Sequence, residues 1–275
     1  MNPLLNVAVK AARRAGRTIL RHIDRLERIA VEQKGRNDFV SEVDRMAEDD
    51  IVGLIQSRYP NHRIVAEERG GELAPAPGRE EVEWIIDPLD GTTNYLHAHP
   101  HFAVSIAARH NGEVRHAVIF DPLRDEMYTA SRGQGAQLNS RRIRVTGQRR
   151  LEHCLLATGL HYRGAAQFER WLRCFKALIP RVIDVRRCGS AALDLAYVAC
   201  GRFDGYWQSG LAPWDIAAGC LLVREAGGLV ADFQGMQNFL ETGQVIAANR
   251  VIFNDLMVII AAETDPDKRR EAPRA

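Results

Sequence analysis

Residues 84–94 read Trp-Ile-Ile-Asp-Pro-Leu-Asp-Gly-Thr-Thr-Asn. The apolar run at 84–86 is typical of a buried strand. Pro88 and Gly91 are residues that commonly interrupt regular structure, so the sequence predicts that this strand breaks directly after its last isoleucine. A buried strand with a defined end holds the residues that follow it at one point of the fold, and here those residues are polar.

Two acidic residues occupy the predicted break. Asp87 and Asp90 flank it, and the carbonyl of Leu89 between them is not expected to continue a strand ladder. Carboxylate and carbonyl oxygens are the ligands that Mg²⁺ prefers. The backbone N–H groups of the turn that begins at Gly91 can hold an anion, above all if a helix starts there. A cation site beside an anion site gives the first hypothesis, which is a metal-assisted reaction of a phosphate.

The overall composition is typical of a globular protein. The chain of 275 residues is long enough for one large core or two smaller ones. Its 37 basic and 35 acidic side chains give a formal net charge of +2, so charge offers no argument for nucleic-acid binding. Local arginine clusters are better explained as solvated faces and ion pairs than as a nucleic-acid surface. These clusters comprise Arg141, Arg142, Arg144, Arg149, Arg150, Arg186 and Arg187.

The cysteines are widely spaced and include no Cys-x-x-Cys pair. They are Cys154, Cys174, Cys188, Cys200 and Cys220. Neither a disulfide framework nor a thiolate metal site is expected from this spacing, which is typical of a reducing cytoplasm. The sequence contains no apolar segment of membrane length and no signal-like run near its start, so we expect a soluble, cytoplasmic protein.

Hydrophobic periodicity predicts the elements of secondary structure. Helices are predicted at 4–26, 41–58, 168–178, 190–200, 214–226 and 254–262. Strands are predicted at 64–66, 102–109, 114–120, 127–130, 136–138, 155–158, 182–185, 203–207, 229–232 and 245–248. Asn111-Gly112 predicts a tight hairpin turn, and the Pro- and Gly-rich stretch at 70–78 predicts a loop.

The pattern changes near residue 147 from antiparallel hairpins to alternating strands and helices. We therefore expect an N-terminal α+β half at 1–147, with a large antiparallel sheet and most of the candidate metal ligands. A C-terminal α/β half at 148–262 is expected to hold a second sheet and Asp215. The charged, Pro-containing end at 263–275 is predicted to be disordered.

Four segments place an acid at the end of an apolar run. They contain Asp44, Glu67 with Glu68, Asp87 with Asp90, and Asp215. Adjacent carboxylates such as Glu67 and Glu68 repel each other and find few partners without a cation. Taken alone, each acid has a structural explanation, and Asp215 after Pro213 can equally be a helix N-cap. Taken together, the four segments favour a hydrolase with two or three metal ions.

The order of these segments resembles that of a known family. The segment 87–94 resembles the first signature of the inositol monophosphatases, and Trp214-Asp-Ile-Ala-Ala-Gly219 with Glu225-Ala-Gly-Gly228 resembles the second. Three further segments match in order and spacing. They are Asp38-Phe-Val-Ser with Asp44, Ala66-Glu-Glu68, and Gly189-Ser-Ala-Ala-Leu-Asp-Leu-Ala-Tyr-Val198. The resemblance extends from about residue 4 to 262 and is greatest to the bacterial SuhB-type branch.

This resemblance implies a layered αβαβα sandwich of mixed α+β and α/β class. It implies hydrolysis of inositol monophosphate, or of a similar small polyol or sugar phosphate, by direct attack of water without a phosphoenzyme. Two or three Mg²⁺ ions per site are implied, with Li⁺ as an inhibitor, and the chain is expected to be a homodimer. Phosphatases of nucleotide 3′-phosphates or fructose 1,6-bisphosphate use the same metal core, but they generally diverge from Thr-Thr-Asn at 92–94.

A function of another class remains open. SuhB-like proteins are implicated in transcription antitermination through contacts with RNA polymerase, so the resemblance also implies a binding role in which phosphatase activity is secondary. The arginine-rich segment at 141–150 offers a surface for such a partner. Nothing in the residues themselves decides between the two functions.

The resemblance also assigns roles to individual residues. The metal ligands would be Glu67, Asp87, the Leu89 carbonyl, Asp90 and Asp215. Glu67 would orient the attacking water, assisted by Thr92, whose hydroxyl would be hydrogen-bonded to Asp44. The substrate contacts would come from Asp90, Gly91, Thr92, Gly189, Ser190, Ala191, Gln208 and Asp215.

Three features depart from the family or suggest a second site. Family members that prefer inositol phosphates usually carry glutamate seven residues before the second-signature aspartate, where this chain has Gln208. Glutamine lacks the charge-assisted acceptor, so inositol phosphate is predicted to be a poor substrate. The alternating histidines at 97, 99 and 101 suggest a transition-metal site, but a functional one is disfavoured. Asp194, in an apolar helix, is predicted to be a satisfied structural acid.

Overall fold

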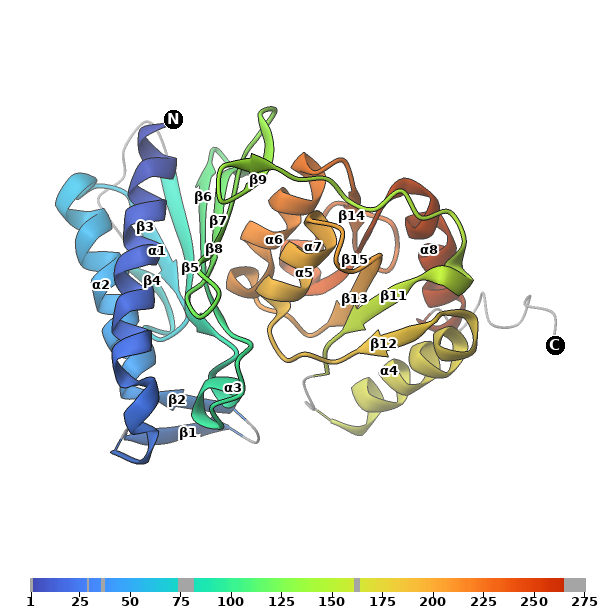
Figure 1. Ribbon diagram of the computed structural model, residues 1–275, viewed down its shortest axis with the longest axis horizontal. Helices are drawn as coiled ribbons and strands as arrows, with labels where there is room; N and C mark the ends of the chain where they lie inside the picture. Colours follow the sequence, from blue (N-terminus) through green and yellow to red (C-terminus); the bar gives the residue numbers. More distant parts are fainter. Residues whose placement is uncertain (1, 29, 36–37, 74–81, 161–163, 265–275) are drawn as a thin grey trace.

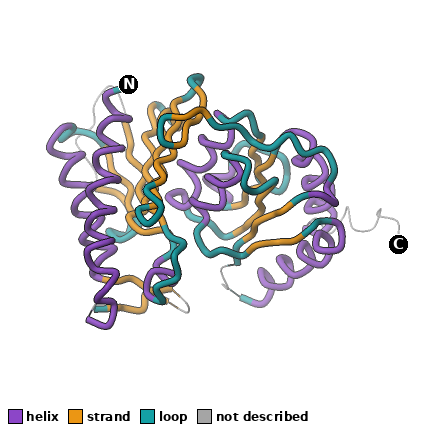
Figure 2. The backbone as a smooth tube through the Cα atoms, in the orientation of Figure 1, coloured by secondary structure: helices purple, strands orange, loops and turns teal. Residues whose placement is uncertain are grey.

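Two β-sheets alternate with three layers of helices along the long axis of the molecule (Figures 1 and 2). The computed structural model describes residues 2–28, 30–35, 38–73, 82–160 and 164–264. The αβαβα sandwich expected from the sequence is confirmed. Within those described ranges, no helix is long and apolar enough to cross a membrane.

The first sheet contains eight described strands in the order β10-β9-β8-β7-β6-β5-β3-β4. Their bounds are Arg63–Ala66 (β3), Gly71–Leu73 (β4), Val82–Asp90 (β5), Ala103–His110 (β6), Glu113–Asp121 (β7), Glu126–Ser131 (β8), Gly135–Leu138 (β9) and Arg141–Arg142 (β10). Neighbouring strands are antiparallel except for β3 and β5, which are parallel. Asn111 and Gly112 both have positive φ between β6 and β7, which confirms the predicted hairpin turn.

Two long helices cover the outer face of this sheet (Figure 1). The elements on this side are α1 (Pro3–His22), a 3₁₀ segment η1 (Ile23–Arg28), β1 (Val31–Gly35), β2 (Asp38–Ser41) and α2 (Glu42–Arg58). Alanines one turn apart on α1 are buried, as its amphipathic pattern predicts. The prediction of a single helix over 4–26 is wrong at its end, because Arg25 leaves helical geometry with φ −137°.

The strand β5 does not break where the sequence predicts. It continues through Pro88 to Asp90, and its register against β6 shifts between Asp87 and Asp90. Proline is tolerated there because a bulge does not need the missing N–H. The Leu89 N–H donates to Asp87 Oδ1 at 3.0 Å instead of joining the ladder. Both acids therefore lie on the strand itself.

Short elements account for the other differences from the sequence prediction. The loop predicted at 70–78 is wrong over Gly71–Leu73, which form β4 after a turn at Gly70 with φ 67°. Residues 74–81 lie outside the described residues. The unpredicted elements β1, β2, β10, α3 (Thr92–Leu96) and α7 (Phe239–Thr242) are too short to show a periodic pattern.

The second sheet has the order β12-β11-β13-β15-β14 and contains parallel and antiparallel pairs. Its strands are Leu155–Thr158 (β11), Asp184–Arg186 (β12), Gly205–Ser209 (β13), Leu229–Ala231 (β14) and Gln244–Ala248 (β15). The outer layer on this side consists of α4 (Ala165–Leu178) and α8 (Arg250–Thr264) (Figure 1). Residues 265–275 of the predicted disordered tail lie outside the described residues.

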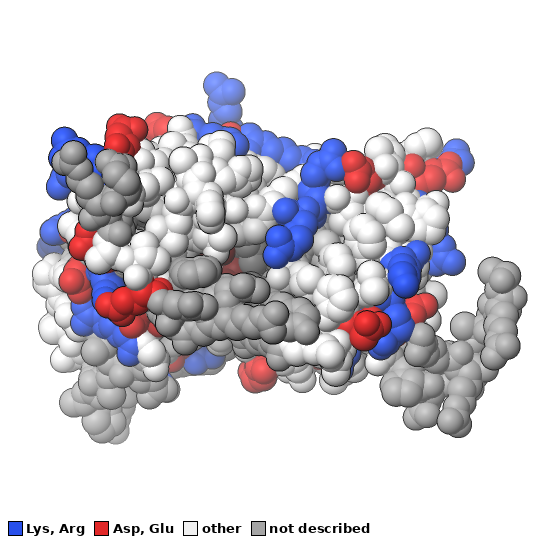
Figure 3. All heavy atoms as spheres, turned by 90° about the horizontal axis from the view of Figure 1, so that it is seen from below, with Lys and Arg blue, Asp and Glu red and all other residues white. Residues whose placement is uncertain are grey.

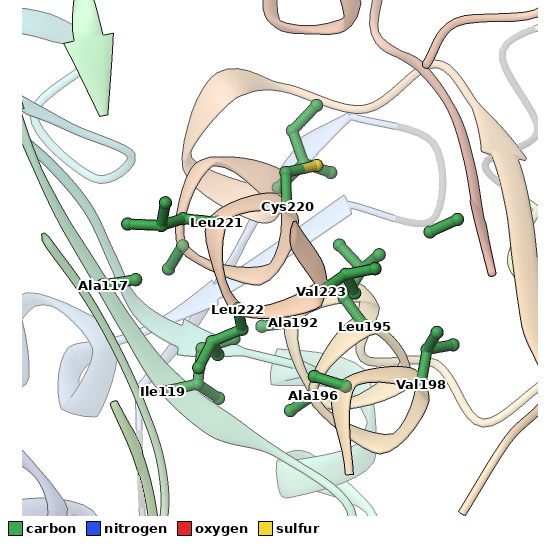
Figure 4. Packing of buried hydrophobic residues seen from close by; sticks show 14 of the residues in the cluster. Ala117, Ile119, Ala192, Leu195, Ala196, Val198, Cys220, Leu221, Leu222 and Val223 are labelled. Atoms are coloured by element: carbon green, nitrogen blue, oxygen red, sulfur yellow. The ribbon is translucent and has the colours of Figure 1, made fainter. Parts of the chain in front are cut away.

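The middle layer consists of α5 (Ala191–Ala199) and α6 (Pro213–Glu225), which lie between the two sheets. Both helices are apolar on almost all sides, as expected for helices buried on two faces. A Cβ on Gly219 of α6 would lie 2.6 Å from Leu195 of α5, so the glycine permits the close approach of the helices. Figure 4 shows Leu222 of α6 beside Ile119 of the first sheet, in one hydrophobic core with α5.

Candidate active site

Four carboxylates converge at the edge where β3 and β5 end. Asp87 and Asp90 lie on β5, and Glu67 directly follows its parallel neighbour β3. The Glu67 N–H extends this pairing by donating to the Ile86 carbonyl at 3.2 Å. Asp215 comes from the first turn of α6, which packs against β5 and its neighbour β6. Parallel strands end at one edge of a sheet, and the helix brings the fourth acid there from far along the chain.

The pKa of Asp87 is affected by the other three acids. Its side chain is buried, and the pKa of its carboxyl is raised well above the ordinary range. Burial is the largest cause of this raised pKa, followed by the negative charges of Glu67, Asp90 and Asp215. Like charges at this depth repel one another, so the arrangement is suited to binding cations.

Asp90 is tied to the start of α5. Its Oδ2 accepts hydrogen bonds from the Ser190 hydroxyl at 2.6 Å and from the Ala192 N–H at 2.7 Å. Burial raises the pKa of Asp90, while these hydrogen bonds and one from the Ala191 N–H lower it. Ser190 is also the N-cap of α5, accepting from the Leu193 N–H at 3.3 Å. The polar groups of Ser190 and Ala191, expected to contact substrate, are thus directed at Asp90.

Asp215 has a capping role, but not the one considered from the sequence. The N-cap position of α6 is Ala212, and Asp215 is the third helical residue. Its Oδ2 accepts a hydrogen bond from the Ala212 N–H at 2.8 Å, which fixes the carboxylate at the helix start. The same carboxylate raises the pKa of Asp87. Capping and membership of the acidic site are therefore compatible.

A hydrogen-bonded pair links α2 to the turn after β5. The Thr92 hydroxyl lies 2.8 Å from Asp44 Oδ1 and 3.1 Å from the Leu89 carbonyl oxygen, and either can accept its proton. The other carboxylate oxygen of Asp44 accepts from the Ser41 N–H at 2.9 Å and from the Ser41 hydroxyl. Burial raises the pKa of Asp44, and the hydrogen bonds from Ser41 and Thr92 oppose that rise. The Thr92–Asp44 contact expected from the resemblance is present.

No other residue fits at position 91 in this turn. Gly91 has φ 98° and precedes the short helix α3. A Cβ here would lie 3.0 Å from the His101 carbonyl oxygen and 3.3 Å from the Gly189 carbonyl oxygen. Both the backbone conformation and the close approach of two loops therefore require glycine.

Asn94 has a structural role that the motif alone does not reveal. Its side-chain N–H₂ donates to the His101 carbonyl at 2.7 Å and to the Cys188 carbonyl at 2.8 Å. Gly189, with φ 86°, would place a Cβ 3.0 Å from the same amide. Asn94 thus joins the loop before β6 to the loop before α5, and so holds the two sides of the site together.

Glu48 is a second residue that the sequence analysis does not identify. It is buried on α2, and its carboxylate accepts from the Glu68 N–H at 2.8 Å and from Arg69 Nε at 3.1 Å. These bonds fix the turn that starts at Glu67. The i, i+4 spacing from Asp44 places both acids on one helix face, which is the signal that could have identified it.

Gln208 lies on β13 and is buried. Its Oε1 accepts a hydrogen bond from the Tyr206 hydroxyl at 2.6 Å. Burial raises the pKa of Tyr206, and the charges of Asp194, Asp90 and Asp215 raise it further, so this pair lies near the acidic site. A Cβ on Gly159 would lie 1.8 Å from the Gln208 side chain, so glycine is needed beside it.

The alternating histidines do not form a common site. Residues 97 and 99 are exposed, whereas His101 is buried. Asp194 is buried as well. Its Oδ1 faces His101 Nε2 at 3.8 Å but has no hydrogen-bond partner among the described residues, so this oxygen is not satisfied as the sequence predicts.

Comparison with known proteins gives the family suggested by the motifs. The model of the inositol monophosphatase family matches residues 1–264. A protein of Pseudomonas aeruginosa described as Nus factor SuhB is 48% identical over 272 residues, which are 98% of this chain and 100% of that protein.

Two solved structures agree in fold. The extragenic suppressor protein SuhB from Bartonella henselae has a TM-score of 0.90 and 41% identity, covering 94% of this chain and 98% of its own. The IMPase of Thermotoga maritima has a TM-score of 0.85 and 34% identity, covering 96% of this chain and 99% of its own. With matching motifs, fold and length, the chain belongs to the inositol monophosphatase family.

Proposed function

We propose that this protein is a Mg²⁺-dependent phosphatase of a small polyol or sugar phosphate. The observation that carries this proposal is the gathering of Glu67, Asp87, Asp90 and Asp215 where β3 and β5 end, close enough for the other three charges to raise the pKa of buried Asp87. A buried carboxylate with three partly buried acids around it is unfavourable unless cations compensate the charges. All of these ligand atoms are carboxylate oxygens, which suit a hard cation.

The residues present fit two or three Mg²⁺ ions. Glu67, Asp87, Asp90 and Asp215 would hold them, together with the carbonyl oxygen of Leu89. When bound, the metal ions would neutralise phosphoryl oxygens, stabilise the leaving alkoxide and lower the pKa of water. Uncatalysed hydrolysis of a phosphate monoester is so slow that the whole site must supply on the order of 20 kcal/mol.

The chain itself would orient the attacking water and receive its proton. Glu67 and the Thr92 hydroxyl would hold the water. With the Thr92 O–H donating to Asp44 Oδ1 at 2.8 Å, the lone pairs of Thr92 remain available to accept from it. As the water attacks phosphorus, its proton would pass to Thr92 Oγ1 while the proton of Thr92 passes to Asp44. The raised pKa of buried Asp44 makes it a better proton acceptor.

The turn at Gly91 would hold the phosphate. The N–H groups of Gly91 and Thr92 lie at the start of α3, and N–H groups in such positions bind anionic oxygens. Gly189, Ser190 and Ala191 contribute on the other side by fixing Asp90 and the approach of the two loops. Gln208 and Asp215 would contact the hydroxyl groups of the polyol, with Gln208 in place of the stronger charged acceptor.

A phosphate-release assay over a panel of esters tests this proposal. The panel contains inositol 1-phosphate, other polyol and sugar phosphates, a nucleotide 3′-phosphate and fructose 1,6-bisphosphate, each with and without Mg²⁺ and Li⁺. We expect release from polyol or sugar phosphates that requires Mg²⁺ and falls with Li⁺. Release that is independent of Mg²⁺, or no release from any ester, would contradict the proposal.

The P. aeruginosa relative favours a second function. That protein is described as a Nus factor, and this chain is 48% identical to it over its whole length. We infer a cytoplasmic homodimer that also contacts RNA polymerase. On the face seen from below, small groups of basic and acidic side chains alternate with uncharged surface (Figure 3). Arg186 and Arg150 of the arginine clusters form ion pairs with Asp184 and Glu152. A protein partner is thus favoured over direct binding to nucleic acid.

Complementation separates this second function from catalysis. An Asp90→Asn variant expressed in a bacterium that lacks its own SuhB should still rescue growth if the binding role is the essential one. Rescue by the wild type alone would assign the phenotype to phosphatase activity. Light scattering on the purified protein measures whether it is a dimer.

A further inference from the structure

Three side chains with metal-binding atoms gather beside α5, outside the four carboxylates. His101 comes from the loop before β6, Cys188 from the loop before α5, and Asp194 from α5 itself. One ligand atom of each lies within 4.8 Å of the other two. They come from both halves of the chain, because His101 precedes β6 of the first sheet and the other two follow β12 of the second.

Two of these atoms are buried without a hydrogen bond. His101 and Asp194 are 6% and 1% exposed. His101 Nε2 and Asp194 Oδ1 have no hydrogen-bond partner among the described residues. They lie 3.8 Å from each other, which is too far for a hydrogen bond. The two groups form only this long ion-pair contact, and buried polar atoms are normally hydrogen-bonded, so an ion held by both atoms would satisfy them.

The surrounding structure holds the three groups in place. Asn94 donates to the carbonyls of both His101 and Cys188, which fixes the two loops relative to each other. The ring of Tyr197 stands edge-on to the His101 ring, at 5.7 Å between centroids and 78° between planes. Asp194 lies in the first turn of α5, which Ser190 caps. The site is therefore built on one helix and on two loops that Asn94 joins.

We propose that His101 Nε2, Cys188 Sγ and Asp194 Oδ1 bind a Zn²⁺ ion. Zn²⁺ takes imidazole, thiolate and carboxylate ligands in tetrahedral geometry, in which ligand atoms lie roughly 3.3–3.8 Å apart. The His101–Asp194 distance of 3.8 Å already fits. The half-buried Cys188 side chain needs only a small movement to complete the set. A thiolate and an imidazole exclude Mg²⁺ as the preferred ion.

The charges of the three donors also suit a divalent ion. Burial raises the pKa of Asp194 to about 6 and that of Cys188 to about 12, so at neutral pH the Asp194 carboxyl is largely ionised while the Cys188 thiol keeps its proton. A divalent cation offsets both charges and displaces the thiol proton. With three protein ligands, the fourth position is left for water or a small anion. The bound ion would connect the loop of His101 to α5, whose first turn holds Asp90.

The cysteine spacing gave no indication of this site. A thiolate metal site is usually identified by clustered Cys and His residues, whereas these ligands are 87 and 6 residues apart in the sequence (101 to 188 and 188 to 194). Only the folded arrangement brings them together.

Titration with Co²⁺ tests the proposal in the full-length protein. Excess Mg²⁺ keeps the carboxylates saturated, and Co²⁺ replaces Zn²⁺ because its tetrahedral thiolate sites have visible d–d bands and a near-ultraviolet thiolate-to-cobalt charge-transfer band. We expect both at one equivalent of Co²⁺, and their loss when Zn²⁺ is added. Cys188→Ser should abolish the charge-transfer band, while the matched control Cys200→Ser should keep it.

The other two ligands have their own controls. His101→Gln and Asp194→Asn should weaken Co²⁺ affinity at least tenfold, since even loss of a residue that only supports a ligand costs about 10- to 100-fold. His99→Gln, at an exposed histidine two residues away, should leave affinity unchanged. Absence of the band in the wild type, or its persistence in Cys188→Ser, would overturn the proposal.

A measurement on the wild-type protein covers the case in which a variant does not fold. Zn²⁺ should slow alkylation of Cys188 by iodoacetamide, followed by mass spectrometry, and should leave the rate at Cys200 unchanged. Equal rates at Cys188 with and without Zn²⁺ would contradict the site.

Discussion

Two groups of polar side chains meet the first turn of α5, and they differ in charge rather than in burial. Glu67, Asp87, Asp90 and Asp215 are all acids, and the pKa of Asp87 is raised first by burial and then by the charges of the other three. The cluster of His101, Cys188 and Asp194 combines a base, a thiol and one acid, so it is partly balanced without an ion. Hard ligands of one charge demand several cations, whereas mixed ligands select a softer one.

The strongest test of this contrast is Asp90→Asn. The amide removes one charge from the carboxylates but retains an oxygen that can accept from Ser190 and Ala192. We expect a folded protein with at least about 100-fold less Mg²⁺-dependent phosphatase activity. Circular dichroism and the release assay measure the two properties. The control is Asp125→Asn, at an exposed residue with φ 48°, which asparagine also tolerates. Turnover like that of the wild type in Asp90→Asn would refute the metal site.

Gly91→Ala should disturb the contact between the turn after β5 and the loop that carries His101. The new Cβ would lie 3.0 Å from the His101 carbonyl oxygen, and φ 98° is strained for alanine. We expect a loss of about 3 kcal/mol in the free energy of unfolding, together with most of the activity. Urea denaturation provides the measurement. Gly53→Ala, at an exposed helix position with no neighbouring atoms, should instead be neutral or slightly stabilising.

Asn94→Ala asks whether the two regions depend on each other. The change leaves two carbonyl groups, at His101 and Cys188, without their shared donor. The expected cost is about 2 kcal/mol in the free energy of unfolding, with weaker Co²⁺ binding and lower phosphatase activity in the same variant. Asn61→Ala, at an exposed residue, is the matched control. If only one of the two functions changes, the regions are independent.

The pH dependence of metal binding distinguishes an all-acidic site from a mixed one. The folded-state pKa of Asp87 is raised above its unfolded value, so the folded protein keeps a proton that the unfolded chain releases. Without metal, stability from this group is therefore lost as pH rises through the raised pKa. Bound Mg²⁺ compensates the charge, so the rise in Tm caused by Mg²⁺ should be larger at about pH 8 than at about pH 5. An equal rise at both values would show that Asp87 titrates normally.

The smallest expected effect concerns substrate choice. Gln208→Glu restores a charged acceptor beside the Tyr206 hydroxyl. We expect the KM for inositol 1-phosphate to fall about fivefold, corresponding to about 1 kcal/mol. The KM for a substrate without the corresponding hydroxyl serves as the reference. An unchanged KM for inositol 1-phosphate would remove Gln208 from the substrate site.

The family resemblance predicted the sandwich, and the hydrophobic periodicity predicted most of its elements because their patterns are long. The sequence also grouped Asp87 and Asp90 correctly as neighbours, since they lie on one strand. It placed the end of that strand too early, because Pro88 is tolerated in a bulge that the residues alone do not reveal. Local rules describe elements well and describe irregularities within them poorly.

The contacts made by single side chains were harder to predict. Asn94 stands within the quoted motif, yet its role depends on carbonyls at His101 and Cys188 that only the fold brings to it. Glu48 acts on a turn twenty residues away. The cluster at His101 combines residues that no spacing rule connects. Each case requires a distance between segments, which a sequence without its fold does not contain.

The bond between Asp90 and the start of α5 joins residues 100 positions apart, which has a consequence for synthesis. All strands of the first sheet are synthesised before either of the helices that cover its inner face, α5 and α6. Until Pro213–Glu225 emerges, apolar residues such as Ile119 have no covering layer, and such surfaces are prone to aggregate. The inner face of the first sheet is therefore exposed until the last third of the chain has been made.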